Sequence, residues 1–237
     1  LPFEWRELSR YGWTLMTLKL LLLRWVQTCT FRRAVGVIFL TAYAKNNVLK
    51  VTGKLSGSTK IIPHGINRRF FIKPRFQRSN SKYSELSPYR LLYVSTIDQY
   101  KHQWRIVEAV ATMRLEGFPL VLDLIGPANP RTLGSLNETV DRLDSQRIWV
   151  YYHGEIPFTK VHRYYGNADL GIFASSCENM PNILLETMAA GLPIACSNRG
   201  PMSEILGDTG VYFDPLCKKS IIAALRQLIA SPKLRRI

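Results

Sequence analysis

The chain has 237 residues, of which 46% are hydrophobic, and it carries 32 Lys and Arg against 17 Asp and Glu, a formal net charge of +15. This length allows one large domain or one domain with part of another, and the apolar content excludes a wholly disordered chain. No uninterrupted apolar run reaches the roughly 18 residues that span a bilayer, because Lys19 and Arg24 break the longest candidate, residues 12–31.

The positive charge is concentrated in the first part of the chain. Residues 1–90 hold 17 Lys and Arg but only three acidic residues, whereas residues 91–237 hold 15 basic and 14 acidic ones. Such a basic segment can bind nucleic acid, anionic lipid headgroups or phosphorylated substrates. No recognition-helix, zinc-finger or RNP-like pattern occurs, so nucleic acid is not an expected partner. A solvated face without any partner remains the alternative.

The basic segment begins with a long helical pattern. The expected elements of this part are a helix over about 12–31, a strand over 34–40, a helix over about 42–52 and a short strand over 60–62. The first helix combines Trp13 and Trp25 with flanking arginines, as helices at a membrane surface do. A core helix of a partly absent domain would look the same. The flanking arginines are Arg6, Arg10, Arg24, Arg32 and Arg33.

A polar, Ser-rich stretch over 79–88 predicts a surface loop, and after residue 90 the chain alternates between short apolar runs and helical patterns. The expected strands are 91–95, 120–125, 148–153, 170–174, 193–196 and 211–213. Helical spacing of apolar residues is clearest in 103–116 and 131–145. Apolar strands that alternate with amphipathic helices are typical of a parallel sheet covered on both faces. We therefore predict an α/β domain with a doubly wound parallel sheet.

The cysteines and histidines do not have the spacing of metal ligands. No C-x-x-C pair occurs, and the four His do not supply the missing ligands, so no zinc site is expected. Buried, reduced thiols are the simpler expectation, and they favour a cytoplasmic protein. The cysteines are Cys29, Cys177, Cys196 and Cys217.

The most informative segment follows an apolar strand that ends at Ala174. A polar turn with Pro181 comes next, and a helix is expected to begin at Asn182. Such a turn lies at the carboxyl end of a parallel strand, where open α/β sheets bind ligands, and the helix offers its first N–H groups to a diphosphate. Two carboxylates, Glu178 and Glu186, flank the turn and can accept hydrogen bonds from hydroxyl pairs.

The surrounding pattern, S-x-x-E-x-x-P-N-x-x-L-E-x-M-A-x-G-x-P over residues 175–193, resembles the retaining GT-B glycosyltransferases, in particular glycosyltransferase family 4. Glu178 and Glu186 correspond to the E-x7-E signature of that family. The resemblance covers about residues 60–215 well and 1–59 only loosely. Further similar pieces are 62–66, 93–95 leading to Lys101, 124–126, 152–154 and 200–205.

The resemblance implies a role for each matching residue. Glu178 would contact hydroxyls of the donor sugar and Lys101 would neutralise the diphosphate leaving group, so these two are the expected catalytic residues. The donor sugar would be bound by Glu178, Asn179, Met180, Pro181 and Asn182. The nucleotide would be bound by Glu186 at the ribose hydroxyls, and by Lys101, Gly126, His153, Gly154, Glu155, Ile183 and Leu184. No D-x-D triplet occurs, so neither a metal nor another cofactor is expected beside the nucleotide diphosphosugar donor.

The resemblance also implies a division of the chain and an activity. Residues 63–237 would form the nucleotide-sugar-binding, Rossmann-like domain, and 1–62 would be an incomplete N-terminal α/β segment, a remnant of the acceptor-binding domain and its linker. The whole enzyme, in polysaccharide biosynthesis, would transfer a hexosyl group from a nucleotide diphosphosugar, UDP-sugar rather than GDP-sugar, to a saccharide or lipid-linked acceptor with retention of configuration. Residues 1–90 would face an anionic membrane, which would make a cytoplasmic protein peripheral at that surface.

Two departures from the family pattern leave an alternative open. Ser95 and Thr96 stand where the family commonly has Gly-Arg, whose Arg is a diphosphate ligand, and His102 stands where a Gly usually follows the Lys. His102, Arg105 or a basic residue near 68–69 would have to replace the missing cation. The alternative is a catalytically weakened relative, or a non-catalytic module that binds nucleotide sugars or docks on a membrane.

Overall fold

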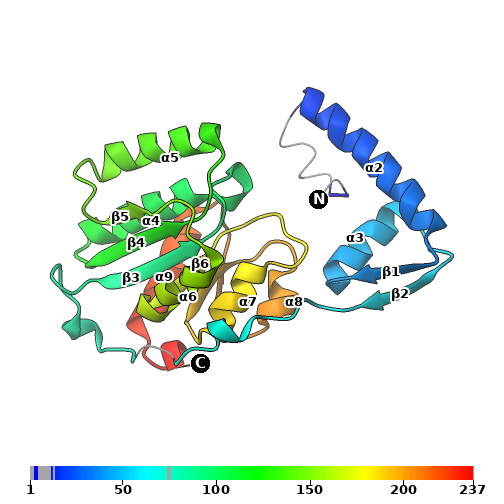
Figure 1. Cartoon of the computed structure of the whole chain (residues 1–237). Helices are drawn as coiled ribbons and strands as arrows, with labels where there is room; N and C mark the ends of the chain where they lie inside the picture. The colour runs from blue at the N-terminus through cyan, green and yellow to red at the C-terminus, as the bar shows by residue number, and fades with distance from the viewer. Residues whose placement is uncertain (1–2, 5–11, 13, 74–75, 237) are drawn as a thin grey trace. The chain divides into compact units, whose positions relative to one another are not determined.

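The computed structural model describes residues 3–4, 12, 14–73 and 76–236 (Figure 1). Arg6, Arg10 and Trp13, which the sequence places around the basic helix, lie outside these residues. The chain forms two compact units, one of Leu1–Gly65 with Cys177–Pro181 and the other of Ile66–Ser176 with Asn182–Ile237. The division into domains at residues 62 and 63 stays a prediction.

The second unit is built on a sheet of six parallel strands, in the order β5-β4-β3-β6-β7-β8. The central strand β3 pairs with β4 on one side and with β6 on the other, so that Leu91 lies between Leu122 and Leu170. This arrangement confirms the predicted doubly wound α/β fold. The strands are β3 (Tyr89–Val94), β4 (Leu120–Ile125), β5 (Val150–Tyr152), β6 (Leu170–Phe173), β7 (Ile194–Ser197) and β8 (Val211–Phe213).

Helices cover both faces of this sheet because the strands are apolar on both sides (Figure 1). One core cluster includes Ile106, Leu136 and Leu225, and a second cluster includes Val161 and Tyr165. The α-helices are α4 (Gln103–Leu115), α5 (Pro130–Leu143), α6 (Phe158–Asn167), α7 (Asn182–Ala189), α8 (Met202–Leu206) and α9 (Lys218–Ala230). The 3₁₀ turns are η1 (Arg68–Phe70), η2 (Asn80–Lys82), η3 (Gln99–Lys101) and η4 (Leu234–Arg236).

Two buried aspartates explain where the structure departs from the sequence-based elements. The carboxylate of Asp144 accepts the backbone N–H groups of residues 148, 149 and 150 at 2.8–3.0 Å, so the strand expected over 148–153 begins only at Val150. Asp169 accepts the hydroxyl of Tyr83 at 3.1 Å. The stretch 79–88, expected to be a plain surface loop, is therefore tied to the core through Tyr83, which is 9% exposed.

The first unit is smaller and contains a parallel pair of strands, β1 (Gly36–Phe39) and β2 (Ser58–Ile61), with helices α2 (Leu15–Arg33) and α3 (Ala42–Thr52). The side chain of Thr41 caps α3 by accepting the Ala44 N–H at 3.0 Å. Its small core joins Phe3, Val37, Phe39, Val48 and Leu55. Within the part of the chain that the structure describes, none of the helices combines the length and the apolarity needed to cross a membrane.

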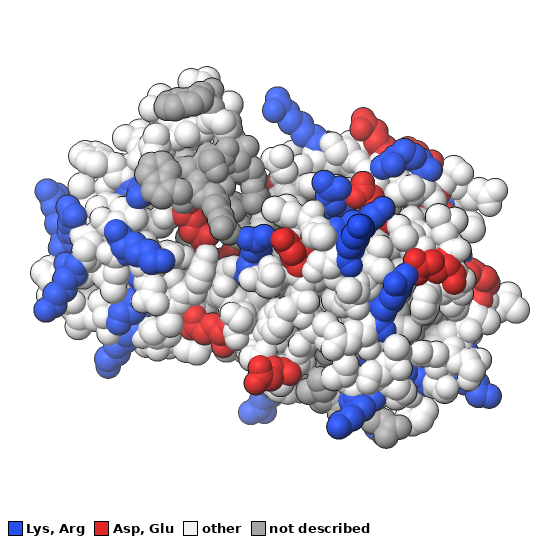
Figure 2. Space-filling view, turned by 180° about the vertical axis from the view of Figure 1, so that it is seen from behind, with Lys and Arg blue, Asp and Glu red and all other residues white. Residues whose placement is uncertain are grey.

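Helix α2 carries large apolar side chains that face solvent. Leu18 and Trp25 are each 65% exposed and Leu22 is 60% exposed, while Thr28 is the buried residue of the helix. Lys19, Arg32 and Arg33 of the same helix are exposed. On the face that Figure 2 shows, Lys and Arg side chains are spread over the surface and interleaved with Asp and Glu.

The four cysteines are free, but their burial differs from the prediction. Cys196 on β7 is buried, whereas Cys29 and Cys177 are partly exposed and Cys217 is exposed. The prediction of buried thiols is therefore wrong for Cys217, because this residue lies at the solvent-facing start of α9.

Candidate functional site

The strand order of the second unit reverses between β3 and β6. From β3 the chain runs through β4 to β5 on one side, and β6, β7 and β8 follow on the other. In open parallel sheets, ligands bind outside the carboxyl ends of the two strands at such a switch point. Two sequence-predicted segments follow these strands, namely the turn with Lys101 after β3 and the turn that leads into α7 after β6.

Hydrogen bonds join these two turns. The Ser176 N–H, beyond β6, donates to the Tyr100 carbonyl at 2.9 Å, and the Ser176 hydroxyl lies 3.0 Å from Nε2 of His102. The Lys101 carbonyl accepts a hydrogen bond from the Tyr93 hydroxyl at 2.8 Å. The Lys101 ammonium lies 5.5 Å from the ring centroid of Phe173, the last residue of β6. The structure thus holds Lys101 beside the carboxyl end of β6.

The two departures from the family pattern have a local structural basis. His102 adopts the left-handed conformation with φ 56°, which explains why a glycine is usual at this position. The Gln103 side chain donates to the Ser95 hydroxyl at 2.9 Å and to the Thr96 carbonyl at 2.8 Å, so a neutral amide supports the turn that lacks the family Arg. Arg105 lies on α4 with its guanidinium 3.0 Å from Glu108.

Glu186 lies one turn inside α7 and is only 5% exposed. Its Oε2 accepts the hydroxyl of Tyr165, on α6, at 3.0 Å. Burial raises the pKa of the Glu186 carboxyl, which the hydrogen bond from Tyr165 partly offsets, and burial likewise raises the pKa of the Tyr165 phenol. On the same helix Asn182 is exposed, Ile183 is partly exposed and Leu184 is fully buried. Leu184 therefore supports the helix from the core.

The predicted nucleotide loops after β4 and β5 contact each other. The Gly126 N–H donates to the Gly154 carbonyl at 2.8 Å, and the Tyr152 hydroxyl donates to the Gly126 carbonyl at 2.9 Å. Gly126 has φ 140°, and a Cβ there would lie 2.3 Å from the Ser95 carbonyl oxygen. Only glycine fits, because the loops after β3 and β4 approach each other so closely.

The side chain of His153 points along the sheet toward Asp123 of β4. Its Nε2 donates to Asp123 Oδ1 at 2.7 Å, and its ring lies 5.0 Å from that of Tyr164. Asp123 and Tyr164 thus hold the His153 ring in place beside this loop.

Glu178, Asn179, Met180 and Pro181, the predicted donor-sugar residues other than Asn182, belong to the first unit. There the Thr41 hydroxyl donates to the Asn179 carbonyl at 3.0 Å, and the His64 N–H lies 3.5 Å from the Met180 sulfur.

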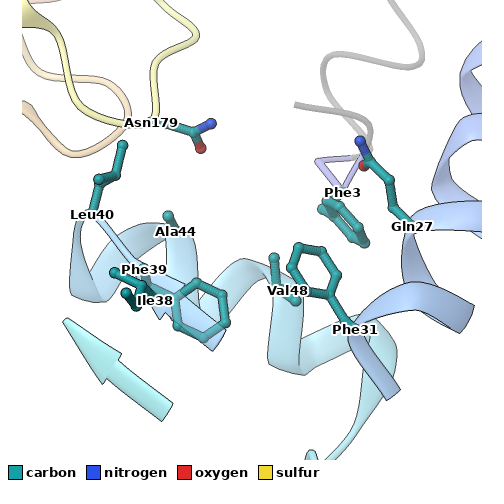
Figure 3. A pocket seen from close by; sticks show the side chains of 9 residues that line it. All are labelled: Phe3, Gln27, Phe31, Ile38, Phe39, Leu40, Ala44, Val48 and Asn179. Atoms are coloured by element: carbon teal, nitrogen blue, oxygen red, sulfur yellow. The ribbon is translucent and has the colours of Figure 1, made fainter. Parts of the chain in front are cut away.

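Asn179 also borders a mainly apolar pocket of about 240 Å³ in this unit (Figure 3). Its lining consists of Phe3, Gln27, Phe31, Ile38, Phe39, Leu40, Ala44, Val48 and Asn179.

Sequence reasoning missed the polar partners of the site. Tyr165 and Asp123 bond Glu186 and His153 from other segments of the sequence. Ser176 lies within the 175–193 pattern, which assigns it no role, and bonds His102. A signal existed only for Asp123, because it is the one charged residue within the apolar run of 120–125. Among the residues that the structure describes, no group of three or more His, Cys, Asp or Glu has a metal-binding arrangement.

Curated relatives align with most of the length of this chain. This chain is 26% identical over 190 residues to the O-antigen chain mannosyltransferase B of Escherichia coli, and the alignment covers 79% of this chain and 47% of that protein. It is 25% identical over 186 residues to the putative teichuronic acid biosynthesis glycosyltransferase TuaC of Bacillus subtilis, covering 75% and 43% respectively. The chain thus spans less than half the length of these relatives.

Solved structures of glycosyltransferases share the fold. HepE of Anabaena in complex with UDP and glucose superposes with a TM-score of 0.76 at 18% identity, over 97% of this chain and 61% of that one. Sucrose-phosphate synthase of Thermosynechococcus elongatus gives a TM-score of 0.74 at 22% identity, over 96% and 56%. The model of the family described as glycosyl transferases group 1 matches residues 88–231, which contain the switch point, Lys101 and Glu186. The chain therefore belongs to the glycosyl transferases group 1 family, with a GT-B-type fold.

Proposed function

We propose that the chain is the donor-binding part of a retaining glycosyltransferase of family 4, which transfers a hexosyl group from a UDP-sugar to a saccharide or lipid-linked acceptor. The observation that carries this proposal is the position of Lys101 and α7 at the two strands of the switch point, inside the segment that matches the family. An E-x7-E pair, Glu178 and Glu186, supports assignment to family 4.

The nucleotide is bound by the second unit in this proposal. Tyr165 occupies Oε2 of Glu186, which leaves Oε1 to accept the ribose hydroxyls. The backbone of 153–155 lies against the base, and Ile183 and Leu184 place the first turn of α7 beside the diphosphate. Uridine is favoured because structural neighbours were solved with UDP and with UDP-glucose.

The chemistry rests on Lys101 and Glu178. The leaving group departs with the electrons of the broken glycosidic bond, and the ammonium of Lys101 stabilises the negative charge that develops on the diphosphate. Glu178 and the backbone of 179–182 orient the donor sugar through its hydroxyls. A side-chain cation and helix N–H groups suffice for this role, so we propose that catalysis needs no metal or other cofactor.

The first unit serves the acceptor in this proposal. Its pocket has apolar walls with Asn179 at the border, which suits an acceptor with an apolar part next to the donor-sugar loop. The exposed apolar side chains of α2, interspersed with Lys19, Arg32 and Arg33, suit an anionic membrane surface. A cytoplasmic protein that is peripheral at the membrane would meet a lipid-linked acceptor there.

Thermal unfolding with a panel of nucleotides tests the proposal. UDP at 100 times its dissociation constant should stabilise the chain by about 2.7 kcal/mol relative to the ligand-free state. GDP at the same concentration should stabilise it less. UDP-glucose should stabilise at least as well, and EDTA should change neither result. Absence of any shift at millimolar nucleotide, or a strict requirement for a divalent cation, would contradict the proposal. A nucleotide shift without transfer by the complete enzyme would favour the non-catalytic alternative.

A further inference from the structure

The predicted base-binding loop, residues 153–155, is anchored by a carboxylate outside the predicted site. Asp123 lies within β4 and is 6% exposed, and its Oδ1 accepts the Nε2–H of His153 at 2.7 Å. Asp123 pairs in register with Tyr151, two residues before His153. Residues paired in register point to the same face of a sheet, so Asp123 and Tyr151 share one face. The hydrogen bond to Asp123 places the His153 ring on that side as well.

A second strand supplies a partner for this carboxylate. Arg90 of β3 donates from one nitrogen to both oxygens of Asp123, at 2.9 and 3.2 Å. A buried charge without such a partner is costly. Arg90 and Asp123 therefore form a preorganised pair, and the imidazole of His153 completes it.

Contacts of the His153 ring and of the loop backbone both hold the loop in place. The imidazole is held between Asp123 and the ring of Tyr164. The His153 N–H donates to the Leu124 carbonyl at 2.9 Å, and the next carbonyl, of Gly154, accepts from Gly126. Rotation of the imidazole away from Asp123 would remove one of the contacts that hold this loop against β4.

We infer that Asp123 is a positioning residue for nucleotide selectivity: through His153 it fixes the backbone of 153–155 in the geometry that matches one base. This inference rests on the proposed function, because it takes from it that this loop contacts the base. A rigid set of donors and acceptors rejects a wrongly shaped base, whereas a displaced or mobile set does not.

The space around Asp123 should allow this side chain to be replaced without loss of the fold. The pair borders a cavity of about 470 Å³ that Arg90, Asp123, His153, Tyr164, Gly166 and Asn167 line. Water can therefore fill the space that a shorter side chain leaves, so Asp123→Ala should fold.

The test compares two probes, UDP and inorganic pyrophosphate, by titration calorimetry on the 237-residue chain. Pyrophosphate occupies the diphosphate position without touching the base loop. Asp123→Ala should weaken UDP about tenfold, the lower end of what loss of a charged hydrogen-bond partner costs, and should leave pyrophosphate within about twofold. The preference for UDP over GDP should fall by a similar factor. His153→Ala should give the same pattern, and the double variant should be no weaker than either single one.

Asp144→Ala is the matched control. Asp144 is equally buried, at 4% exposed, and it holds the opposite, amino end of β5. Its loss should lower the melting temperature without changing the ratio of UDP to pyrophosphate affinity. An Asp123→Ala chain that loses both ligands equally, or neither, would overturn the inference, and so would an equal change of the ratio in Asp144→Ala. A wild-type chain that binds pyrophosphate but no nucleoside diphosphate would overturn the proposed function and this inference with it.

Discussion

At the scale of single residues, Glu186 shows a conflict between stability and binding. Its carboxylate is buried, and burial raises its pKa above the ordinary value. A raised carboxyl pKa means that the folded state binds the proton more tightly than the unfolded one. The associated stability is therefore complete below the ordinary pKa and is lost as pH rises through the folded-state pKa. Above the folded-state pKa, the ionised carboxylate destabilises the empty chain.

Glu186→Gln should accordingly raise the melting temperature of the ligand-free chain at pH 7 to 8 but not at pH 4. The amide keeps the shape and an acceptor for Tyr165 but has no charge to desolvate. Thermal unfolding across this pH range, monitored by circular dichroism, measures the difference. A variant whose melting temperature differs from that of the wild type by the same amount at every pH would show that the charge has no part in it.

The two glutamates should differ in what they bind. Glu186→Gln should weaken UDP and UDP-sugar alike, by about ten- to a hundredfold, since a charged hydrogen-bond partner contributes about 1.5–3 kcal/mol. Glu178→Gln should spare UDP and reduce the discrimination between UDP-sugars. Calorimetric titration of each variant with UDP and two UDP-hexoses separates these outcomes. Equal loss of UDP binding in both variants would refute this division of roles.

At the scale of elements, the turn after β4 depends on a residue without a side chain. Gly126→Ala places a Cβ 2.3 Å from the Ser95 carbonyl oxygen at a φ of 140°, so the loops after β3 and β4 must separate. We expect a loss of about 2 kcal/mol or more in unfolding free energy, which is the scale of strain and lost contacts at such positions. UDP binding should weaken as well. Chemical denaturation measures the first effect.

Gly134 provides the control for this substitution. It lies inside α5, and an added Cβ meets nothing within 4 Å. Gly134→Ala should therefore stabilise the chain by about 0.5–1 kcal/mol, because alanine loses less backbone freedom in a helix than glycine does. If both variants were destabilised alike, the close approach at Gly126 would not be the cause.

The elements were the part of the molecule that the sequence predicted best. The apolar runs at 91–95 and 120–125 and the helix beginning near Asn182 are confirmed within two residues, because burial on both faces and a proline-marked turn leave strong local patterns. The start of β5 was not predictable, since it depends on Asp144 accepting amides four to six residues later. Tyr165 beside Glu186 was not predictable either, because packing of α6 on α7 brings them together.

At the scale of the whole molecule, the placement of charge and apolar surface on α2 predicts membrane binding. Co-sedimentation with vesicles of phosphatidylcholine and phosphatidylglycerol should rise with the anionic fraction and fall with salt. Leu22→Ser with Trp25→Ser should weaken it by about tenfold or more, because each buried apolar side chain contributes about 1.5–3 kcal/mol.

Two other exposed leucines give the matched comparison. Leu86 and Leu115 are 100% and 91% exposed and lie in the second unit. Leu86→Ser with Leu115→Ser should leave vesicle binding unchanged. Equal, negligible binding of the wild-type chain to neutral and anionic vesicles, with nucleotide binding intact, would mean that the basic segment is a solvated surface.

The pairing of β3 also affects how the chain folds as it is synthesised. Leu91 pairs with Leu122 on one side and with Leu170 on the other. During synthesis, the β6 edge of β3 therefore stays unpaired until the ribosome has made β6, about 80 residues after β3. At roughly 5–20 residues per second, that delay lasts several seconds. An apolar strand with an unpaired edge is a template for association with other chains. Nascent chains that stall before residue 170 should therefore aggregate, while those that have passed β6 should not.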